Sequence, residues 1–170
     1  MKAEKYLLIN KADEVVIGAL LHQLKLTLAL AESCTGGLVG NLITNIPGSS
    51  AYFLGGYITY SNIAKVSLLG VSEITLQEFG AVSEQTVIEM AVGARQGLHS
   101  DIGLSISGIA GPNGGTSEKP VGLVWIGVCF ENFQVAQDLH LKGNRLEIKQ
   151  QSAQQALNFL HRTLTNQFGE

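Results

Sequence analysis

The sequence carries little charge, and none of it is concentrated. Only 15% of the 170 residues are Asp, Glu, Lys or Arg, and the net charge is −3 with a pI near 5.8. No run of Lys and Arg occurs anywhere in the chain. Because nucleic-acid-binding domains carry a basic face, this composition argues against DNA or RNA as a partner.

Cysteine is equally scarce. The two cysteines, Cys34 and Cys129, lie in apolar or turn contexts and suggest neither a disulfide framework nor a zinc site. The histidines are scattered without metal-ligand spacing, which predicts helix or strand surfaces for all of them: His22, His99, His140 and His161. We therefore expect no metal and no cofactor.

Long apolar runs are also missing. No segment approaches the ~20 residues of a membrane span, and the apolar stretch Tyr6-Leu7-Leu8-Ile9 is too short for a signal peptide. We expect a cytoplasmic protein with no membrane partner. With 45% hydrophobic residues, the chain is expected to form one domain over residues 1–170 that buries roughly two thirds of its unfolded surface.

Hydrophobic periodicity predicts an alternation of helices and strands. Helices are expected at 12–25, 38–44, 61–69, 72–78, 83–98 and 144–167, and strands at 24–30, 52–60, 102–107, 121–130 and 133–141. Ser61 and Ser83 are expected to cap their helices, and Gly55-Gly56 suggests a bulge. Helices separate the first strands while the last two pair directly, which predicts an α/β fold, a three-layer α/β/α sandwich with a mixed sheet.

The heptapeptide Ala31-Glu32-Ser33-Cys34-Thr35-Gly36-Gly37 stands between an apolar strand and a helix. Such a turn can expose backbone N–H groups at the positive helix end, where a phosphate or an oxyanion is stabilised. Ser33 is the candidate nucleophile, although serine in this place is also a common N-cap. Cys34 and Thr35 are its rivals. Cys34 is better explained as a small buried hydrophobe, and Thr35 as a cap or ligand-binding hydroxyl.

Tyr60 and Lys65 follow the second strand, so sheet topology can bring them beside Ser33. Together they would form a Ser–Tyr–Lys hydrolytic set, with Tyr60 relaying a proton. Lysine acts as a base only when neutral, and lowering its pKa from about 10.4 to about 7–8 costs roughly 4 kcal/mol, which burial can supply. The simpler alternatives are a solvated Lys65 and a Tyr60 that serves packing.

Two further segments are candidates for binding. The glycine-rich loop 108–115 can bring N–H groups close to an anion, but it fits neither a Walker nor a Rossmann pattern and is otherwise a tight loop. Arg145 could bind a phosphate through two parallel hydrogen bonds. Its alternative is a surface charge in the first turn of the last helix.

Taken together, these residues resemble the C-terminal domain of the competence/damage-inducible CinA family. The segments that carry the resemblance occur in family order along nearly the whole chain: AESCTGG at 31–37, GSSAYF at 48–53, TYSNIAK at 59–65, GAVSE at 80–84, SISGIAGPNGG at 105–115 and EKPVG at 118–122. The N-terminal domain of the longer family members has no counterpart in this sequence, so its activities do not carry over.

The stand-alone form of this family hydrolyses the carboxamide of nicotinamide mononucleotide to nicotinate mononucleotide and ammonia without a metal. The resemblance therefore implies this substrate, with Ser33 as nucleophile and Tyr60 and Lys65 as the base system. It also implies that two turns hold the substrate, formed by Thr35, Gly36 and Gly37 and by Ser107, Gly108, Ile109, Ala110 and Gly111. We further expect a homo-oligomer, a dimer or higher.

The chain departs from the family in one place. The family commonly has Gly-Asp-Arg followed by a second Arg four residues later, whereas Asn144 and Lys149 stand at these positions here. This weakens a nucleotide-phosphate role for Arg145, and Lys149 cannot reproduce a bidentate contact. The alternative to an amidase is a non-catalytic nucleotide-binding or partner module of the competence and damage response. Direct DNA binding fits the acidic charge poorly.

Overall fold

A computed structural model describes residues 12–169. The Tyr6–Ile9 stretch lies outside these residues. The elements in chain order are α2 (Asp13–Leu24), β1 (Leu28–Glu32), α3 (Leu38–Thr44), the 3₁₀ turn η1 (Ser49–Ala51), β2 (Phe53–Ile58), α4 (Asn62–Leu69), α5 (Glu73–Glu78), α6 (Glu84–Leu98), β3 (Ile102–Gly108), β4 (Leu123–Cys129), β5 (Gln134–His140) and α7 (Arg145–Phe168).

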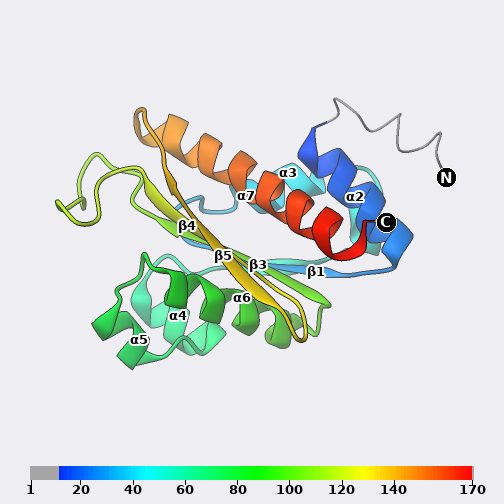
Figure 1. The fold of residues 1–170 in the computed structure, drawn as a ribbon, viewed down its shortest axis with the longest axis horizontal. Helices are drawn as coiled ribbons and strands as arrows, with labels where there is room; N and C mark the ends of the chain where they lie inside the picture. The colour runs from blue at the N-terminus through cyan, green and yellow to red at the C-terminus, as the bar shows by residue number, and fades with distance from the viewer. Residues whose placement is uncertain (1–11, 170) are drawn as a thin grey trace.

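The five strands form one mixed sheet in the order β2-β1-β3-β4-β5. β1 pairs in parallel with β2 and β3, and β4 pairs antiparallel with both β3 and β5. Helices α2, α3 and α7 cover one face of the sheet and α4, α5 and α6 cover the other (Figure 1). The fold is therefore the three-layer α/β/α sandwich with a mixed sheet that the alternation of helices and strands predicts.

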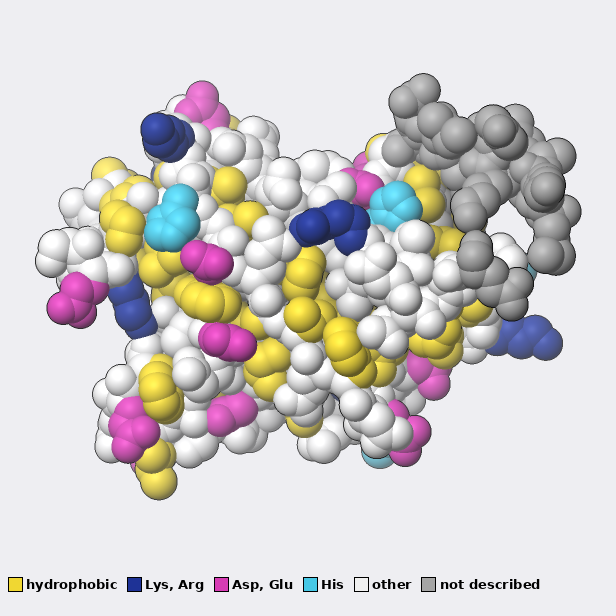
Figure 2. Space-filling view, in the orientation of Figure 1, with side chains coloured by type: hydrophobic (Ala, Val, Ile, Leu, Met, Phe, Trp, Pro, Cys, Tyr) yellow, Lys and Arg dark blue, Asp and Glu magenta, His cyan; other side chains and the backbone are white. Residues whose placement is uncertain are grey.

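Two hydrophobic clusters hold these layers together. The larger one packs α2, α3 and α7 on the sheet and includes Leu21, Leu30 and Leu157. The smaller one packs α4 and α6 on the opposite face around Met90. On the surface, the face drawn in Figure 2 carries Lys and Arg side chains singly among acidic and uncharged ones, without a continuous basic stripe.

Most expected boundaries agree with the structure within two residues. The first strand is the exception, because α2 continues to Leu24 and ends at Lys25, which adopts a left-handed φ of 56°. β1 therefore begins only at Leu28 and not at residue 24. The expected bulge is present in β2, where Leu54 is the extra residue between the pairs Leu28–Phe53 and Ala29–Gly55.

Candidate functional site

The segments singled out in the sequence meet at one edge of the sheet. β1, β2 and β3 are parallel, so their carboxyl ends lie together. β5 runs in the same direction because two antiparallel pairings separate it from β3, and α7 therefore begins at this edge. Figure 1 shows the loop between β3 and β4 projecting at the same end as the start of α7.

The end of β1 places Ser33 inside the molecule. Ser33 is 7% exposed, and its N–H donates to the carbonyl of Ile106 at 3.0 Å, which continues the pairing of β1 with β3. The chain then turns through Gly36 and Gly37, which have φ values of 62° and 99°. Such positive φ values suit glycine, because they strain other residues. Ser33 is not the cap of α3, whose N-cap is Gly37.

Glu32 takes up the N–H groups at the start of α3. Its buried carboxylate accepts hydrogen bonds from the amides of Gly37 at 2.9 Å, Val39 at 3.2 Å and Gly40 at 2.8 Å. The sequence predicts that this turn exposes N–H groups to an oxyanion. The Gly37 amide instead donates to Glu32 and is not free for that role. Glu32 is not among the site residues predicted from the sequence. The signal that could have found it is an acidic residue placed just before the glycine turn.

Lys65 approaches Ser33 from α4. The hydroxyl of Ser61 caps this helix by accepting from the Ala64 amide, and Lys65 follows in the first turn. Its Nζ lies 3.0 Å from Ser33 Oγ and 2.8 Å from the carbonyl oxygen of Thr59, and the residue is only 1% exposed. The structure therefore places Lys65 against Ser33, and the residue is not a solvated surface cation.

Burial lowers the pKa of Lys65 from its ordinary value, since a charged amine is disfavoured away from water. The nearby Cys34 thiol opposes this shift only when it is ionised. Burial itself raises the pKa of that thiol to about 12, so it is neutral near pH 7. The surroundings of Lys65 thus favour the neutral amine, which is the form that can accept a proton.

Cys34 belongs to the hydrophobic core. It is 6% exposed, it packs in the larger cluster, and its raised pKa leaves it as an unreactive thiol. This agrees with the interpretation of Cys34 as a small buried hydrophobe. Both Cys34 and Cys129 are free and buried.

Tyr60 occupies a different position from the one its expected relay role requires. It is 62% exposed, and its hydroxyl accepts a hydrogen bond from Arg145 Nη2 at 2.7 Å. Arg145 Nη1 also donates to the carbonyl oxygen of Gly111 at 2.6 Å. Within residues 12–169 Tyr60 makes no hydrogen bond to Ser33 or Lys65. β2 ends at Ile58 and turns the fully buried Thr59 inward, which leaves Tyr60 at the rim.

The glycine-rich loop forms the opposite wall. Ser107 donates to the carbonyl oxygen of Ala81 at 2.7 Å, and the Ile109 amide donates to Leu123 at 2.9 Å. Lys119 Nζ donates to the carbonyls of Phe79 and Val82, which fastens the loop to the turn before α6.

These walls enclose a cavity of about 270 Å³. Nine of the expected site residues line it: Ser33, Tyr60, Lys65, Ser107, Gly108, Ile109, Ala110, Gly111 and Arg145. Thr35, Gly36 and Gly37 do not. Thr35 is fully buried, and its hydroxyl has no partner within the described residues.

Cys34 also lines the cavity. Five further lining residues were not predicted from the sequence: Asn62, Ala81, Val82, Asn113 and Gly114. Asn62, Ala81, Val82, Asn113 and Gly114 fall inside the segments that carry the family resemblance, and this is the signal that could have found them.

Among the described residues, no group of three or more His, Cys, Asp or Glu side chains is arranged to hold a metal ion. None of the helices within residues 12–169 combines the length and the hydropathy that a membrane span requires.

The fold and the site define a class: a three-layer α/β domain with a buried serine–lysine pair in a polar cavity. The model of the CinA C-terminal domain family matches residues 10–164. The chain belongs to this family.

Relatives support this assignment. A putative competence-damage inducible protein of Halothermothrix orenii is 53% identical over 153 residues, which are 89% of this chain and 37% of that protein. One from Moorella thermoacetica is 54% identical over 155 residues, 91% of this chain and 37% of that protein. The chain thus spans little more than a third of these curated relatives.

Solved structures of similar length have the same fold. The competence/damage inducible protein of Agrobacterium tumefaciens is 39% identical, with a TM-score of 0.86 over 91% of this chain and 96% of that one. The competence damage-inducible protein A of Klebsiella pneumoniae is 30% identical, with a TM-score of 0.87 over 90% and 95%.

Proposed function

We propose that the chain is a serine amidase that hydrolyses the carboxamide of nicotinamide mononucleotide to nicotinate mononucleotide and ammonia. The observation that carries this proposal is the 3.0 Å separation of Lys65 Nζ and Ser33 Oγ at the edge of a polar cavity. A hydroxyl is a weak nucleophile and needs an adjacent base. A buried lysine with a lowered pKa is such a base.

In the first half of the reaction, neutral Lys65 takes the proton of Ser33 while Oγ attacks the carboxamide carbon. The tetrahedral intermediate collapses as protonated Lys65 gives this proton to the leaving nitrogen, which departs as ammonia. In the second half, a water molecule attacks the acyl ester on Ser33, with Lys65 again accepting the proton. Nicotinate mononucleotide leaves, and Ser33 recovers its hydrogen from Lys65.

We assign the oxyanion donors to the glycine-rich loop rather than to the start of α3. The Gly37 amide is bonded to Glu32. The amides of Ala110 and Gly111 belong to residues that line the cavity, and within residues 12–169 neither donates to a protein acceptor. Backbone amides that line a cavity and have no other acceptor can donate to a developing oxyanion and stabilise it strongly.

The nucleotide part of the substrate is proposed to reach the rim formed by Tyr60 and Arg145. The guanidinium has five N–H donors, and two of its nitrogens are engaged by Tyr60 and Gly111. The remaining donors can serve a phosphate. A cytoplasmic location and a homo-oligomeric state are also part of this proposal.

Ammonia release from nicotinamide mononucleotide by the purified chain tests the proposal. S33A should lower turnover by about 10,000-fold or more, because the nucleophile is lost. C34A, which alters the neighbouring side chain, should retain activity within about threefold. Binding of the nucleotide without any ammonia release would instead indicate a non-catalytic nucleotide-binding module. Loss of activity in C34A alone would move the nucleophile to Cys34.

A further inference from the structure

Glu32 is a buried acid that lies next to the cavity without lining it. It is the last residue of β1, directly precedes Ser33, and is 4% exposed. Within the described residues it takes part in no ion pair. The hydrogen bonds of its carboxylate come from three backbone amides in the turn and first residues of α3, those of Gly37, Val39 and Gly40.

The same residue also contacts the lysine side of the site through its main chain. The carbonyl oxygen of Glu32 accepts from the Thr59 amide at 2.8 Å. The carbonyl of Thr59 in turn accepts from Lys65 Nζ, whose other acceptor is Ser33 Oγ. Glu32 therefore connects the nucleophile turn to the strand end that holds the base.

A carboxylate suits this position better than the usual capping residues. A Ser or Thr hydroxyl satisfies one or two N–H groups, whereas a carboxylate offers two oxygens with about four acceptor sites. Here Oε2 accepts from Gly37 and Val39, and Oε1 accepts from Gly40. An amide in place of the carboxylate can present only one such oxygen, and its NH₂ group would face N–H donors.

We propose that Glu32 is a positioning residue for the reaction: its carboxylate fixes the Ser33–Gly37 turn so that Ser33 Oγ lies against Lys65 Nζ. This inference rests on the proposed function, and Glu32 itself does not touch the substrate. Catalytic geometry tolerates displacements of about 0.5 Å, and a misplacement of 1 Å can lower a rate about 100-fold. Loss of the carboxylate should therefore lower the rate of the chemical step and leave substrate binding nearly intact.

The test compares E32Q with E89Q. Glu89 is a matched control, because its carboxylate also caps a helix start, accepting from the Ser72 amide at 2.8 Å and from Thr75 Oγ1 at 2.6 Å, and none of these three residues lines the cavity. In E32Q, kcat for ammonia release should fall about 30- to 100-fold with KM within about twofold of the unaltered chain. E89Q should keep the kcat and the KM of the unaltered chain, even if the melting temperatures of E89Q and E32Q decrease by the same amount.

A second readout does not depend on the nucleotide. A fluorophosphonate reagent that labels activated serines should modify Ser33, as read by intact mass, and this labelling should slow in E32Q by a similar factor. E32D retains the charge but withdraws it by one methylene. Its kcat and its labelling rate should lie between those of E32Q and those of the unaltered chain. E32D replaces E32Q as the test if E32Q does not fold.

The outcomes separate the two proposals. Equal kcat and equal labelling rates in a folded E32Q, or in E32D where E32Q does not fold, overturn the role of Glu32 and leave the amidase proposal standing. If Ser33 is labelled but no ammonia is released, nicotinamide mononucleotide is not the substrate. The labelling rates of E32Q and the unaltered chain then decide the role of Glu32. An unaltered chain that shows neither reaction overturns both.

Discussion

At the scale of single residues, the proposed function of the site depends on the burial of the Lys65 amine. Lys65 is among the largest fully buried side chains of the protein, and both of its acceptors are uncharged oxygens, Ser33 Oγ and the Thr59 carbonyl. A neutral lysine can donate to Thr59 and accept from Ser33, which suits a base. A charged lysine can only donate, so the proposed reaction requires Lys65 in its neutral form.

The proposed amidase reaction therefore has a defined pH dependence. Burial lowers the pKa of Lys65 below the ordinary 10.5. Since the neutral amine is the active form, kcat/KM should rise as pH increases and level off once Lys65 has lost its proton, with a midpoint below 10.5. A pH series of initial rates of ammonia release measures this limb.

K65R should be inactive across the whole series, because arginine stays charged. The same exchange at the exposed Lys142 serves as the matched control and should leave the profile unchanged. An active K65R would exclude a neutral amine as the base.

At the scale of helices and loops, the cavity wall is held by a lysine that does not itself line the cavity. Lys119 comes from the loop between β3 and β4, and its Nζ donates to the carbonyls of Phe79 and Val82 in the turn before α6. Ala81 and Val82 of that turn line the cavity. Charge-assisted hydrogen bonds of this kind contribute about 1.5–3 kcal/mol each.

K119M should therefore loosen the wall that receives the substrate. We expect KM for nicotinamide mononucleotide to rise about tenfold, with kcat reduced less, because Ser33 and Lys65 lie on other segments. Steady-state kinetics of ammonia release would show the difference, and K142M, in an exposed lysine, is the control. Equal KM values in K119M and the unaltered chain would contradict this role for Lys119.

Elements with strong local signals could be predicted from the sequence. Ser61 and Ser83 cap their helices as expected, because a small hydroxyl before an apolar periodic segment stabilises a helix start through neighbouring atoms alone. The placement of Lys65 near Ser33 followed from strand ends meeting at one edge of a parallel sheet.

Contacts between distant segments could not be predicted in the same way. The bond of Tyr60 to Arg145 depends on how α7 is docked, 85 residues further along the chain. The occupation of the Gly37 amide depends on the orientation of one buried side chain, that of Glu32. The acidic residue before the glycine turn marks Glu32 as a candidate, but the sequence specifies neither the orientation of its side chain nor the docking of α7.

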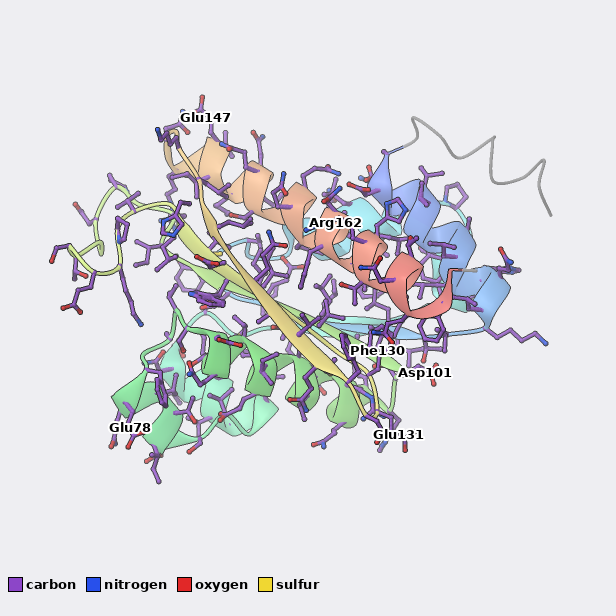
Figure 3. All side chains as sticks on the ribbon, viewed as in Figure 1. Glu78, Asp101, Phe130, Glu131, Glu147 and Arg162 are labelled. Atoms are coloured by element: carbon purple, nitrogen blue, oxygen red, sulfur yellow. The ribbon has the colours of Figure 1, made fainter. Side chains whose placement is uncertain are left out.

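At the scale of the whole molecule, the sheet separates the chemistry from much of the packing. The site gathers at the edge where β1, β2 and β3 end, and Figure 3 shows Glu147 near the start of α7 at this end. Asp101, Phe130 and Glu131 lie together at the other end, around the hairpin between β4 and β5. A substitution near that second end can therefore change stability while the cavity keeps its shape.

G103A tests this separation. Gly103 is the second residue of β3, at the end away from the cavity, and α6 packs so closely there that an added Cβ would lie 2.0 Å from the Ala91 carbonyl oxygen. Because backbone obstructs the methyl group, we expect a loss of about 1–3 kcal/mol of unfolding free energy, or a melting temperature lower by about 2–4 °C per kcal/mol. At a temperature where the variant is folded, its kcat should match that of the unaltered chain.

G97A is the matched control for G103A, because the new methyl group would meet the tip of the Tyr57 side chain at 2.5 Å and that side chain is only half-buried. Tyr57 can move aside, and alanine is the better helix former by about 1 kcal/mol. Urea unfolding of both variants should thus show a clear loss in G103A and a change within about 1 kcal/mol in G97A. Equal unfolding free energies of G103A and G97A would show that α6 can shift away from β3 at little cost. A fall in kcat of folded G103A would show that the two ends of the sheet are coupled.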